Sequence, residues 1–337
     1  MPLTLRVEDP GHGWTAVRLC SDLDLPDSAL QRCDGAWLLE LPQLALERLE
    51  YELEVTYPGG DTERIADPSH ARRAPGAFGE KSVLEAASYR PPAWLDAPRV
   101  PGSLSRVLLG IAMRRRVTAE LWAPDDTDPA AALPLLIAHD GPELARLAAL
   151  TDWAGAMIAA GHLPPFRLAL LPPGDRNNWY SASEGYAGAF ANTLVPALHA
   201  EVAVRGPVAG MGVSLGALAL LHVHRRLPGL LGGLFLQSGS FFTLETDPQE
   251  QGFSRFGRIT PFVRGVLRTR HYEHPIRVAM TCGTEEENAA NNRAMAQALN
   301  RQRYRLFYEE RPDLHNFTGW RDSFEPQLSG LLAAVWG

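Results

Sequence analysis

The 337-residue sequence has little cysteine, no long uncharged apolar run and no excess of positive charge. The three cysteines, Cys20, Cys33 and Cys282, are scattered without metal-ligand spacing, which favours reduced thiols and predicts no metal site. A Cys20–Cys33 disulfide is compatible with the sequence but not required by it. No apolar run approaches membrane-spanning length, and the net charge of -7 gives no reason to expect a nucleic-acid partner. The first residues lack a basic segment followed by an apolar one, so we expect no signal peptide and a cytoplasmic protein.

Hydrophobic residues make up 45% of the chain and charged residues 21%, which is ordinary for a soluble globular protein of about two domains. Residues 1–98 predict an all-β domain, an immunoglobulin-like sandwich, with a linker at its end. Short, partly alternating runs are separated there by clusters of Pro, Asp and Gly. These runs are Trp14–Leu19, Ala36–Leu41 and Arg48–Tyr57. The turn-rich stretches at 67–79 and 89–94 form the predicted linker.

Residues 99–337 predict an α/β domain. It begins with an antiparallel pair, Ser105–Ile111 and Arg115–Trp122, and continues with alternating strands and helices. The expected strands are 133–138, 167–171, 207–211, 233–236, 276–281 and 304–308. The expected helices are 143–160, 186–203, 215–227, 288–300 and one ending near 336. Such alternation predicts a mostly parallel sheet with helices on both faces, and reactive groups at the carboxyl ends of its strands.

A Gly-x-Ser-x-Gly pattern, Gly212-Val-Ser-Leu-Gly216, lies between one of these strands and a helix. This context is typical of a nucleophile elbow, in which the turn holds the serine in a strained conformation. Side chains at Gly212 and Gly216 would collide with the neighbouring strand and helix. We therefore predict Ser214 as a catalytic nucleophile. The alternative is a tight turn that contains an ordinary serine.

A serine nucleophile needs a histidine base, usually oriented by a carboxylate, and in α/β-hydrolases these follow in the order serine, acid, histidine. The acid is expected after the strand at 276–281, where Glu285, Glu286 and Glu287 are adjacent. Glu286 is the first choice and Glu285 the second, because glutamates also suit the first turn of a helix. His315 follows the last strand and is the predicted base.

An oxyanion hole needs two donors. The backbone N–H of Leu215 is one, and the N–H of Gly141, in the loop after the strand at 133–138, is the predicted second. The alternative is that Asp140-Gly141 is merely a turn. Arg176 and Tyr180 follow the strand at 167–171 and are candidate pocket residues.

The placed motifs resemble those of enterochelin (enterobactin) esterase-like proteins, in the putative-esterase group of the α/β-hydrolase superfamily. The resemblance is carried by His-Asp-Gly at 139–141, Gly-Met-Gly-Val-Ser-Leu-Gly at 210–216, Gln-Ser-Gly-Ser at 237–240, Cys-Gly-Thr-Glu-Glu-Glu-Asn at 282–288 and His-Asn-Phe-Thr-Gly-Trp-Arg-Asp at 315–322. It implies an α/β-hydrolase domain behind an N-terminal sandwich, and a serine esterase without a cofactor. We also predict Asp140 and Trp320, which lie in these motifs, as substrate-binding residues, in addition to Arg176 and Tyr180.

The enzymes that give the family its name act on a ferric catecholate siderophore, so a small-molecule ester of this kind is the expected ligand. A homodimer is a further possibility. The sequence departs from the family at Asp313-Leu314 and Pro142-Glu143, which puts the substrate in doubt rather than the reaction. Five arginines between 255 and 270 could hold an anionic aromatic ligand or form a solvated helix face. The alternatives are a carbohydrate or feruloyl-type acyl esterase, an acyltransferase of the same fold, or a non-catalytic sugar- or siderophore-binding protein.

Overall fold

The computed structural model describes residues 3–9, 11, 13–23, 25, 27–42, 45–77 and 79–337. Met1 and Pro2, on which the expected absence of a signal peptide partly depends, lie outside the described residues, as does Phe78 of the expected linker. The chain divides into two compact units. The smaller unit comprises Met1–Arg90, Gly283–Glu286 and Arg311–Gly319; the larger comprises Pro91–Cys282, Glu287–Glu310 and Trp320–Gly337. Two late segments therefore belong with the N-terminal unit.

The smaller unit contains two sheets, and every pair of neighbouring strands described in them is antiparallel. One has the order β1 (Leu3–Glu8), β4 (Ala36–Leu41), β3 (Gln31–Cys33). The other has the order β2 (Ala16–Ser21), β5 (Arg48–Thr56), β8 (Lys81–Glu85), β7 (Arg73–Ala74), with β6 (Thr62–Ile65) beside β5. Alternate side chains point to one face of a strand. Those of both sheets form one buried apolar cluster, which Leu314 also joins.

The larger unit is built on a sheet of eight described strands. Its order is β16 (Arg305–Arg311), β15 (Arg277–Gly283), β14 (Gly233–Gln237), β13 (Ala209–Val213), β11 (Leu135–His139), β12 (Arg167–Leu171), β10 (Arg115–Pro124), β9 (Gly102–Ala112). The strands from β12 to β15 pair in parallel, and β9 and β10 form an antiparallel hairpin at one end. The predicted mostly parallel sheet is confirmed. Its central strands are buried throughout and mostly apolar, because both faces are covered.

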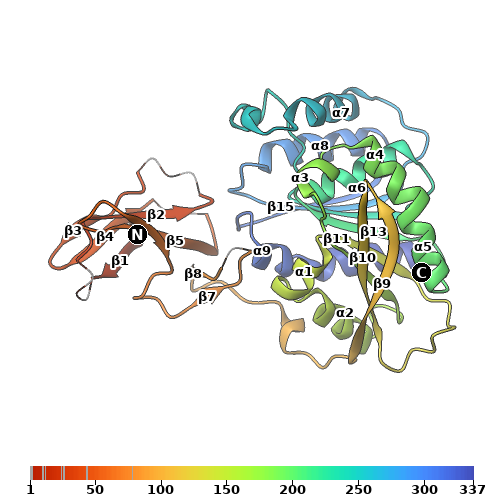
Figure 1. Ribbon diagram of the computed structural model, residues 1–337, viewed down its shortest axis with the longest axis horizontal. Helices are drawn as coiled ribbons and strands as arrows, with labels where there is room; N and C mark the ends of the chain where they lie inside the picture. Colours follow the sequence, from red (N-terminus) through yellow and green to blue (C-terminus); the bar gives the residue numbers. More distant parts are fainter. Residues whose placement is uncertain are drawn as a thin grey trace. The chain divides into compact units, whose positions relative to one another are not determined.

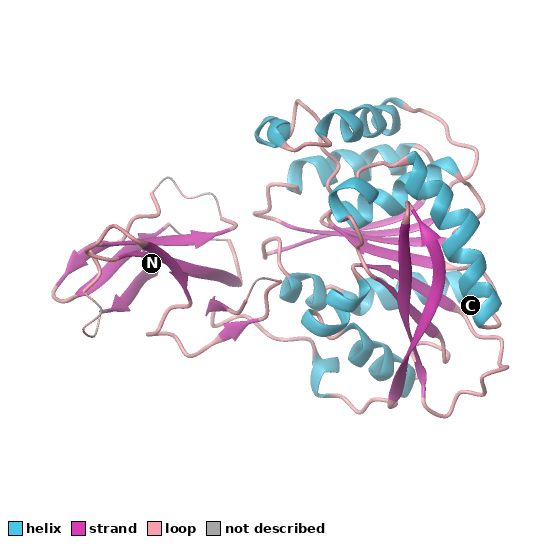
Figure 2. Cartoon of the chain, viewed as in Figure 1, coloured by secondary structure: helices cyan, strands magenta, loops and turns pink. Residues whose placement is uncertain are grey.

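Helices cover both faces of this sheet, with α1 and α2 on one side and α6 and α8 on the other (Figures 1 and 2). Their bounds are α1 Gly141–Leu147, α2 Leu150–Ala159, α3 Arg176–Trp179, α4 Glu184–Ala189, α5 Val195–Glu201, α6 Leu215–Arg226, α7 Phe256–Arg268, α8 Ala289–Arg301, α9 Phe317–Asp322 and α10 Ser329–Trp336. Short 3₁₀ turns lie at Ala93–Asp96 and Pro248–Gly252, and π-type turns at Phe190–Leu194 and Phe324–Leu328. None of the helices in the described ranges is both long enough and apolar enough to cross a bilayer.

Two predicted helices are interrupted. The helix expected over 143–160 is two helices, because Ala149 adopts a left-handed conformation with φ of 51° between them. The helix expected over 186–203 is α4 and α5 joined by the wider turn at Phe190–Leu194. The break at Ala149 has no glycine or proline at the point of interruption, whereas Pro196, which has no N–H to donate, follows the wider turn in the first turn of α5.

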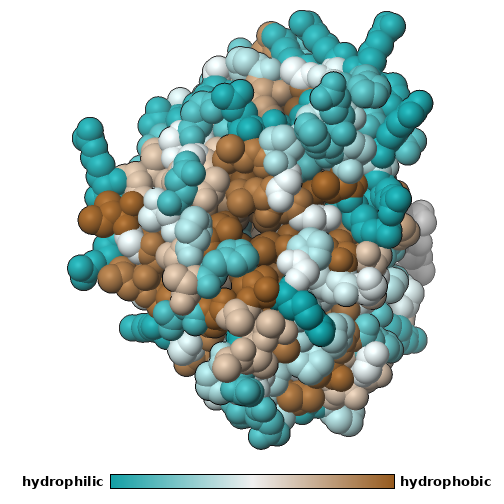
Figure 3. All heavy atoms as spheres, turned by 90° about the vertical axis from the view of Figure 1, so that its right-hand side faces the viewer, coloured by the Kyte–Doolittle hydropathy of each residue, from teal (hydrophilic) through white to brown (hydrophobic). Residues whose placement is uncertain are grey.

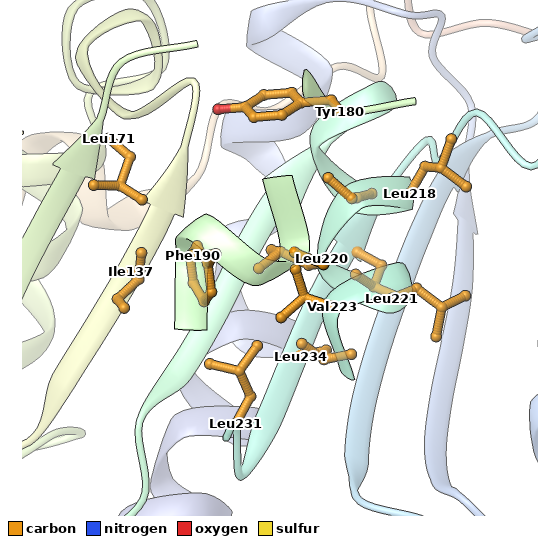
Figure 4. Close-up of a cluster of buried hydrophobic side chains, with 14 of the residues drawn as sticks. Ile137, Leu171, Tyr180, Phe190, Leu218, Leu220, Leu221, Val223, Leu231 and Leu234 are labelled. Carbon is orange, nitrogen blue, oxygen red and sulfur yellow. The ribbon is translucent and has the colours of Figure 1, made fainter. Parts of the chain in front are cut away.

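Helix α6 is the central helix of the larger unit. All its residues from Leu215 to His224 are buried, as expected for a helix that is apolar on most of its circumference. Leu218, Leu220, Leu221 and Val223 pack in one cluster with side chains from neighbouring strands and from the 190–194 turn (Figure 4). The helix start, and Ser214 immediately before it, are therefore held by a rigid core.

Candidate active site

Ser214 lies at the sharp turn between β13 and α6, with φ of 56° and ψ of −123°. A residue with a side chain is strained in this conformation, so it persists only where the surrounding structure imposes it. The two glycines have the steric role that the sequence predicted. A Cβ at Gly212 would lie 2.6 Å from the backbone carbon of Gly216, and one at Gly216 would lie 3.2 Å from Cβ of His139 and from Oδ2 of Asp140.

The hydroxyl of Ser214 lies 3.1 Å from the hydroxyl of Ser240, a buried residue after β14. The backbone N–H of Ser240 also donates to the carbonyl of Ser214 at 3.2 Å. Ser240 is not among the site residues predicted from the sequence. It could have been found, because Ser240 follows a parallel strand at the edge of the sheet where reactive groups gather.

Asp140 and Gly141 join β11 to α1 beside the elbow. Asp140 has φ of 50°, and a Cβ at Gly141 would lie 2.4 Å from the Cα of Leu170, so this position requires glycine. The predicted donors, the N–H groups of Gly141 and Leu215, belong to the first residues of α1 and α6, where helix N–H groups have no acceptor within the helix.

Arg176, at the start of α3, donates to both carboxylate oxygens of Asp140 at 2.9 to 3.1 Å. Burial disfavours the charge of Arg176, but the Asp140 carboxylate outweighs this and raises the pKa of the guanidinium. The Arg176 side chain is 33% exposed and that of Asp140 only 6%. The ion pair therefore leaves part of the Arg176 side chain open to solvent while it fixes the Asp140-Gly141 turn.

His139 is fully buried beneath the elbow. Its Nδ1 lies 3.2 Å from the carbonyl of Gly216, and its Nε2 lies 2.8 Å from the hydroxyl of Tyr186. Burial lowers the pKa of His139 to about 4, so the ring is neutral at pH 7. Tyr180, a predicted pocket residue, is also fully buried and stacks on this ring with centroids 4.6 Å apart. Both side chains support the turn from below.

The predicted acid and base meet in the smaller unit. Oε2 of Glu286 lies 2.8 Å from Nδ1 of His315, while its Oε1 accepts the backbone N–H of Gly283 at 2.7 Å. The Glu286 side chain is 1% exposed and the His315 ring 24%. Glu285 and Glu287, the other two candidates, are exposed. A buried carboxylate bonded to Nδ1 orients the imidazole ring and favours one of its tautomers.

The loop that carries His315 is stabilised by Asp313, whose Oδ1 accepts the backbone N–H of Leu314 and the amide of Asn316, both at 2.8 Å. Arg48 lies 4.0 Å from Oδ2 of Asp313. A Cβ at Gly283 would lie 2.2 Å from the Asp313 carbonyl, so this loop and the one that carries Glu286 are in close contact.

Asp313 provides a pH-dependent test of this loop. Burial raises the pKa of Asp313 from 3.8 to about 6, although hydrogen bonds and Arg48 oppose the shift. Between these values the folded state binds more protons than the unfolded state, so the free energy of unfolding falls as pH rises and levels off above about 6. Asp313→Asn keeps the accepting oxygen without the charge. Relative to wild type, we expect the variant to gain about 1–3 kcal/mol between pH 4 and 7 in denaturant unfolding. A constant difference across this range would contradict the expectation.

Trp320, also predicted near the substrate, is 7% exposed. Its indole N–H donates to the hydroxyl of Ser238 at 3.0 Å, and its carbonyl accepts from the Gln237 side chain at 3.0 Å. These bonds attach Trp320, in α9, to Gln237 at the end of β14 and to Ser238 immediately after it.

Two of the five arginines between 255 and 270 have protein partners. Arg258 donates to the carbonyls of Ser181 and Asn178, which attaches α7 to the segment after α3. Arg264 pairs with Glu245 at 3.0 Å. The other three, Arg255, Arg268 and Arg270, are exposed. No cluster of His, Cys, Asp and Glu able to hold a metal ion occurs within the described ranges, and Cys20, Cys33 and Cys282 form no disulfide.

A serine at a strained strand-to-helix turn, and a buried carboxylate bonded to a histidine, are the groups that serine hydrolases use. Residues 111–333 match the model of the esterase family described as "Putative esterase", and the chain belongs to that family. It is therefore a carboxylic ester hydrolase. Comparison with curated protein sequences gave no match.

Solved structures share this fold. The enterobactin esterase from Shigella flexneri, determined with 2,3-dihydroxy-N-benzoyl-glycine, has a TM-score of 0.74 at 18% identity, over 99% of this chain and 92% of its own. The ferric enterobactin esterase from Salmonella typhimurium gives 0.74 at 18% identity, over 99% and 93%. The feruloyl esterase module from Clostridium thermocellum, complexed with sinapinate, gives 0.54 at 12% identity, over 73% and 94%. The first two likenesses span both units of the chain.

Proposed function

We propose that Ser214, His315 and Glu286 form a catalytic triad for ester hydrolysis. The observation that carries the proposal is the strained conformation of Ser214 at the strand-to-helix turn, in a chain that belongs to an esterase family. The Glu286–His315 hydrogen bond of 2.8 Å supports it. Further support comes from topology, since Ser214 and Glu286 follow the carboxyl ends of β13 and β15, which run parallel in one sheet. Ser214 belongs to the larger unit, and His315 and Glu286 belong to the smaller one. That the three residues act together in one site is therefore part of the proposal.

In this mechanism His315 takes the proton from Ser214 as the hydroxyl oxygen attacks the ester carbonyl. Glu286 holds the imidazole in the required tautomer and stabilises its protonated form. The N–H groups of Leu215 and Gly141 bind the oxyanion of the tetrahedral intermediate. The intermediate expels the alcohol, which takes the proton from His315. Water then attacks the acyl-serine by the same route and releases the acid. No cofactor takes part in these steps.

The proposed substrate is an ester of a catecholate siderophore. The supporting observation is that the likeness to enterobactin esterases extends over 99% of the chain, including the smaller unit, whereas that to the feruloyl esterase module covers 73%. Of the predicted substrate-binding residues, Arg176 has a side chain that is 33% exposed, and we propose that it contacts an anionic ligand. Asp140, Tyr180 and Trp320 are buried, so we propose that they shape the pocket from behind.

The likeness to the feruloyl esterase module favours a second candidate, an acyl esterase or acyltransferase that acts on phenolic or carbohydrate esters. This candidate uses the same three catalytic residues and differs in the acyl donor and acceptor.

A side-by-side hydrolysis assay tests the proposal with ferric enterobactin, methyl ferulate and a short-chain p-nitrophenyl ester. A fluorophosphonate probe and peptide mapping would identify the reacting serine. We expect turnover of ferric enterobactin and labelling of Ser214. Turnover of methyl ferulate but not ferric enterobactin would select the second candidate. Folded protein that hydrolyses none of the three and is not labelled would overturn the triad and support a binding protein instead.

We further propose that the two sheets of the smaller unit form the immunoglobulin-like sandwich, and that residues 1–98 and 99–337 are the two domains, with the segments at 283–286 and 311–319 packed on the first. Cysteines outside disulfides support the proposal of a cytoplasmic protein.

A further inference from the structure

Strand β9 lies at the end of the eight-stranded sheet and is long, extending over 11 residues from Gly102 to Ala112. It pairs with β10 on one side, and within the described part of the chain no strand pairs with its other side. An edge of this kind presents a row of backbone N–H and C=O groups that can pair with another strand. Edge strands of proteins that stay monomeric are usually short, or carry lysine, proline or inward-pointing charges.

Three apolar side chains are exposed on β9, on either side of Arg106, whose side chain is 82% exposed and lies 3.9 Å from Glu120 of β10. Leu104 is 53% exposed, Leu108 55% and Ile111 70%, and they are three of the five large hydrophobic side chains that are exposed among the described residues. A β-bulge opposite Val117/Thr118 inserts one extra residue. It explains why Leu108 and Ile111, three positions apart, are both exposed. Figure 3 views the side of the molecule on which β9 lies in Figure 1, and apolar surface gathers in its middle between hydrophilic regions.

Opposite charges lie at the two ends of the β9–β10 hairpin. Arg114, Arg115 and Arg116 are exposed at its turn. Asp125 and Asp126 are exposed just beyond the other end. The hydroxyl of Ser103 donates to Asp125, and the N–H of Asp125 donates to the carbonyl of Pro101 at 3.1 Å, so this acidic loop lies beside the start of β9.

We propose that β9 pairs antiparallel with β9 of a second copy of this chain, across a two-fold axis. In an antiparallel pair, the end of one strand lies beside the start of the other. The arginines at the turn of one copy then lie near the aspartates of its partner, and the reverse contact occurs at the other end. The apolar side chains of the two strands become cross-strand neighbours and cover part of each other's surface. The strand is thus self-complementary in hydrogen bonding and apolar surface, and the hairpin ends in charge, as a two-fold interface requires; Arg106, near the middle of the strand, is balanced by Glu120 of its own chain.

The oligomeric state of the full chain, measured by sedimentation velocity, tests this proposal. The protein concentration should run from about 1 to about 100 µM, because an interface of one strand from each copy is small and its affinity modest. We expect a reversible dimer for wild type. Leu108→Lys should raise the dissociation constant at least about tenfold, since lysine in the pair introduces like charges opposite each other across the axis. Leu244→Lys is the matched control, because Leu244 is 47% exposed and lies outside β9. It should dimerise as wild type does.

A charge exchange makes the test specific to the proposed orientation. Arg115→Glu and Asp126→Arg should each weaken the dimer, and the double variant, which restores opposite charges at both ends, should recover most of the loss. Circular dichroism would establish that every variant is folded. A wild type that remains monomeric at all concentrations, a dimer unaffected by Leu108→Lys, or a double variant weaker than both single variants would each overturn the proposal. These outcomes do not depend on the proposed catalytic function.

Discussion

Ser214→Ala is expected to lower kcat for ester hydrolysis by a factor on the order of 10⁴–10⁶ while the protein remains folded. The substitution removes one oxygen atom and keeps Cβ, so the backbone strain at φ of 56° is unchanged. The loss of the hydrogen bond to Ser240 should cost about 0.5–1.5 kcal/mol of the free energy of unfolding. The measurement is single-turnover hydrolysis of a p-nitrophenyl ester, with thermal unfolding recorded for the same samples.

Ser240→Ala is the informative control, because its hydroxyl lies 3.1 Å from that of Ser214 and could in principle be the attacking group. We expect this variant to keep a substantial part of the activity and to remain reactive with the fluorophosphonate probe. If Ser214→Ala retained activity within about tenfold of wild type while Ser240→Ala lost it, the nucleophile would have to be reassigned to Ser240.

The elbow could be predicted because its requirements are local. Gly212 and Gly216 are dictated by close backbone approach within a few residues, and the apolar strand and helix on either side are visible as short uncharged runs. The same holds for the central strands, which are buried on both faces and therefore read as continuous apolar segments. Glu286, the proposed acid, is buried between two exposed glutamates, a pattern that follows from the loop conformation rather than from the residue type.

Other features depend on contacts distant in the sequence. The Asp140–Arg176 ion pair joins residues that follow two different strands, and neither residue's neighbours indicate it. The segments at 283–286 and 311–319 belong with the first 90 residues, although they occur late in the chain. The break at Ala149 occurs in a sequence of good helix formers, so tertiary packing overrides local propensity there. Strand β3 is short and fully exposed, and no periodicity distinguishes it from a loop.

Glu286→Gln is the second substitution with a large expected effect. Glu286 accepts a hydrogen bond at each oxygen, from the Gly283 N–H and from His315. Glutamine has nearly the same shape but only one accepting oxygen. In one orientation, the amide NH₂ of the glutamine faces the Gly283 N–H, which is also a donor. In the other, it donates to Nδ1 of His315 and favours the wrong tautomer of the ring. We expect kcat to fall by about 10²–10⁴ with little change in KM, measured as full kinetic profiles on the same ester.

Glu285→Gln and Glu287→Gln are matched controls for this substitution, since each removes the same charge from an adjacent, exposed position. If the loss came only from a change in local charge, all three variants would lose activity alike. If it comes from the orientation of His315, only Glu286→Gln should lose activity, and the two controls should remain within a few-fold of wild type. If Glu285→Gln lost more activity than Glu286→Gln, the acid would have to be reassigned to Glu285, the second choice from the sequence. His315 would then have to bond to Glu285 in the active enzyme.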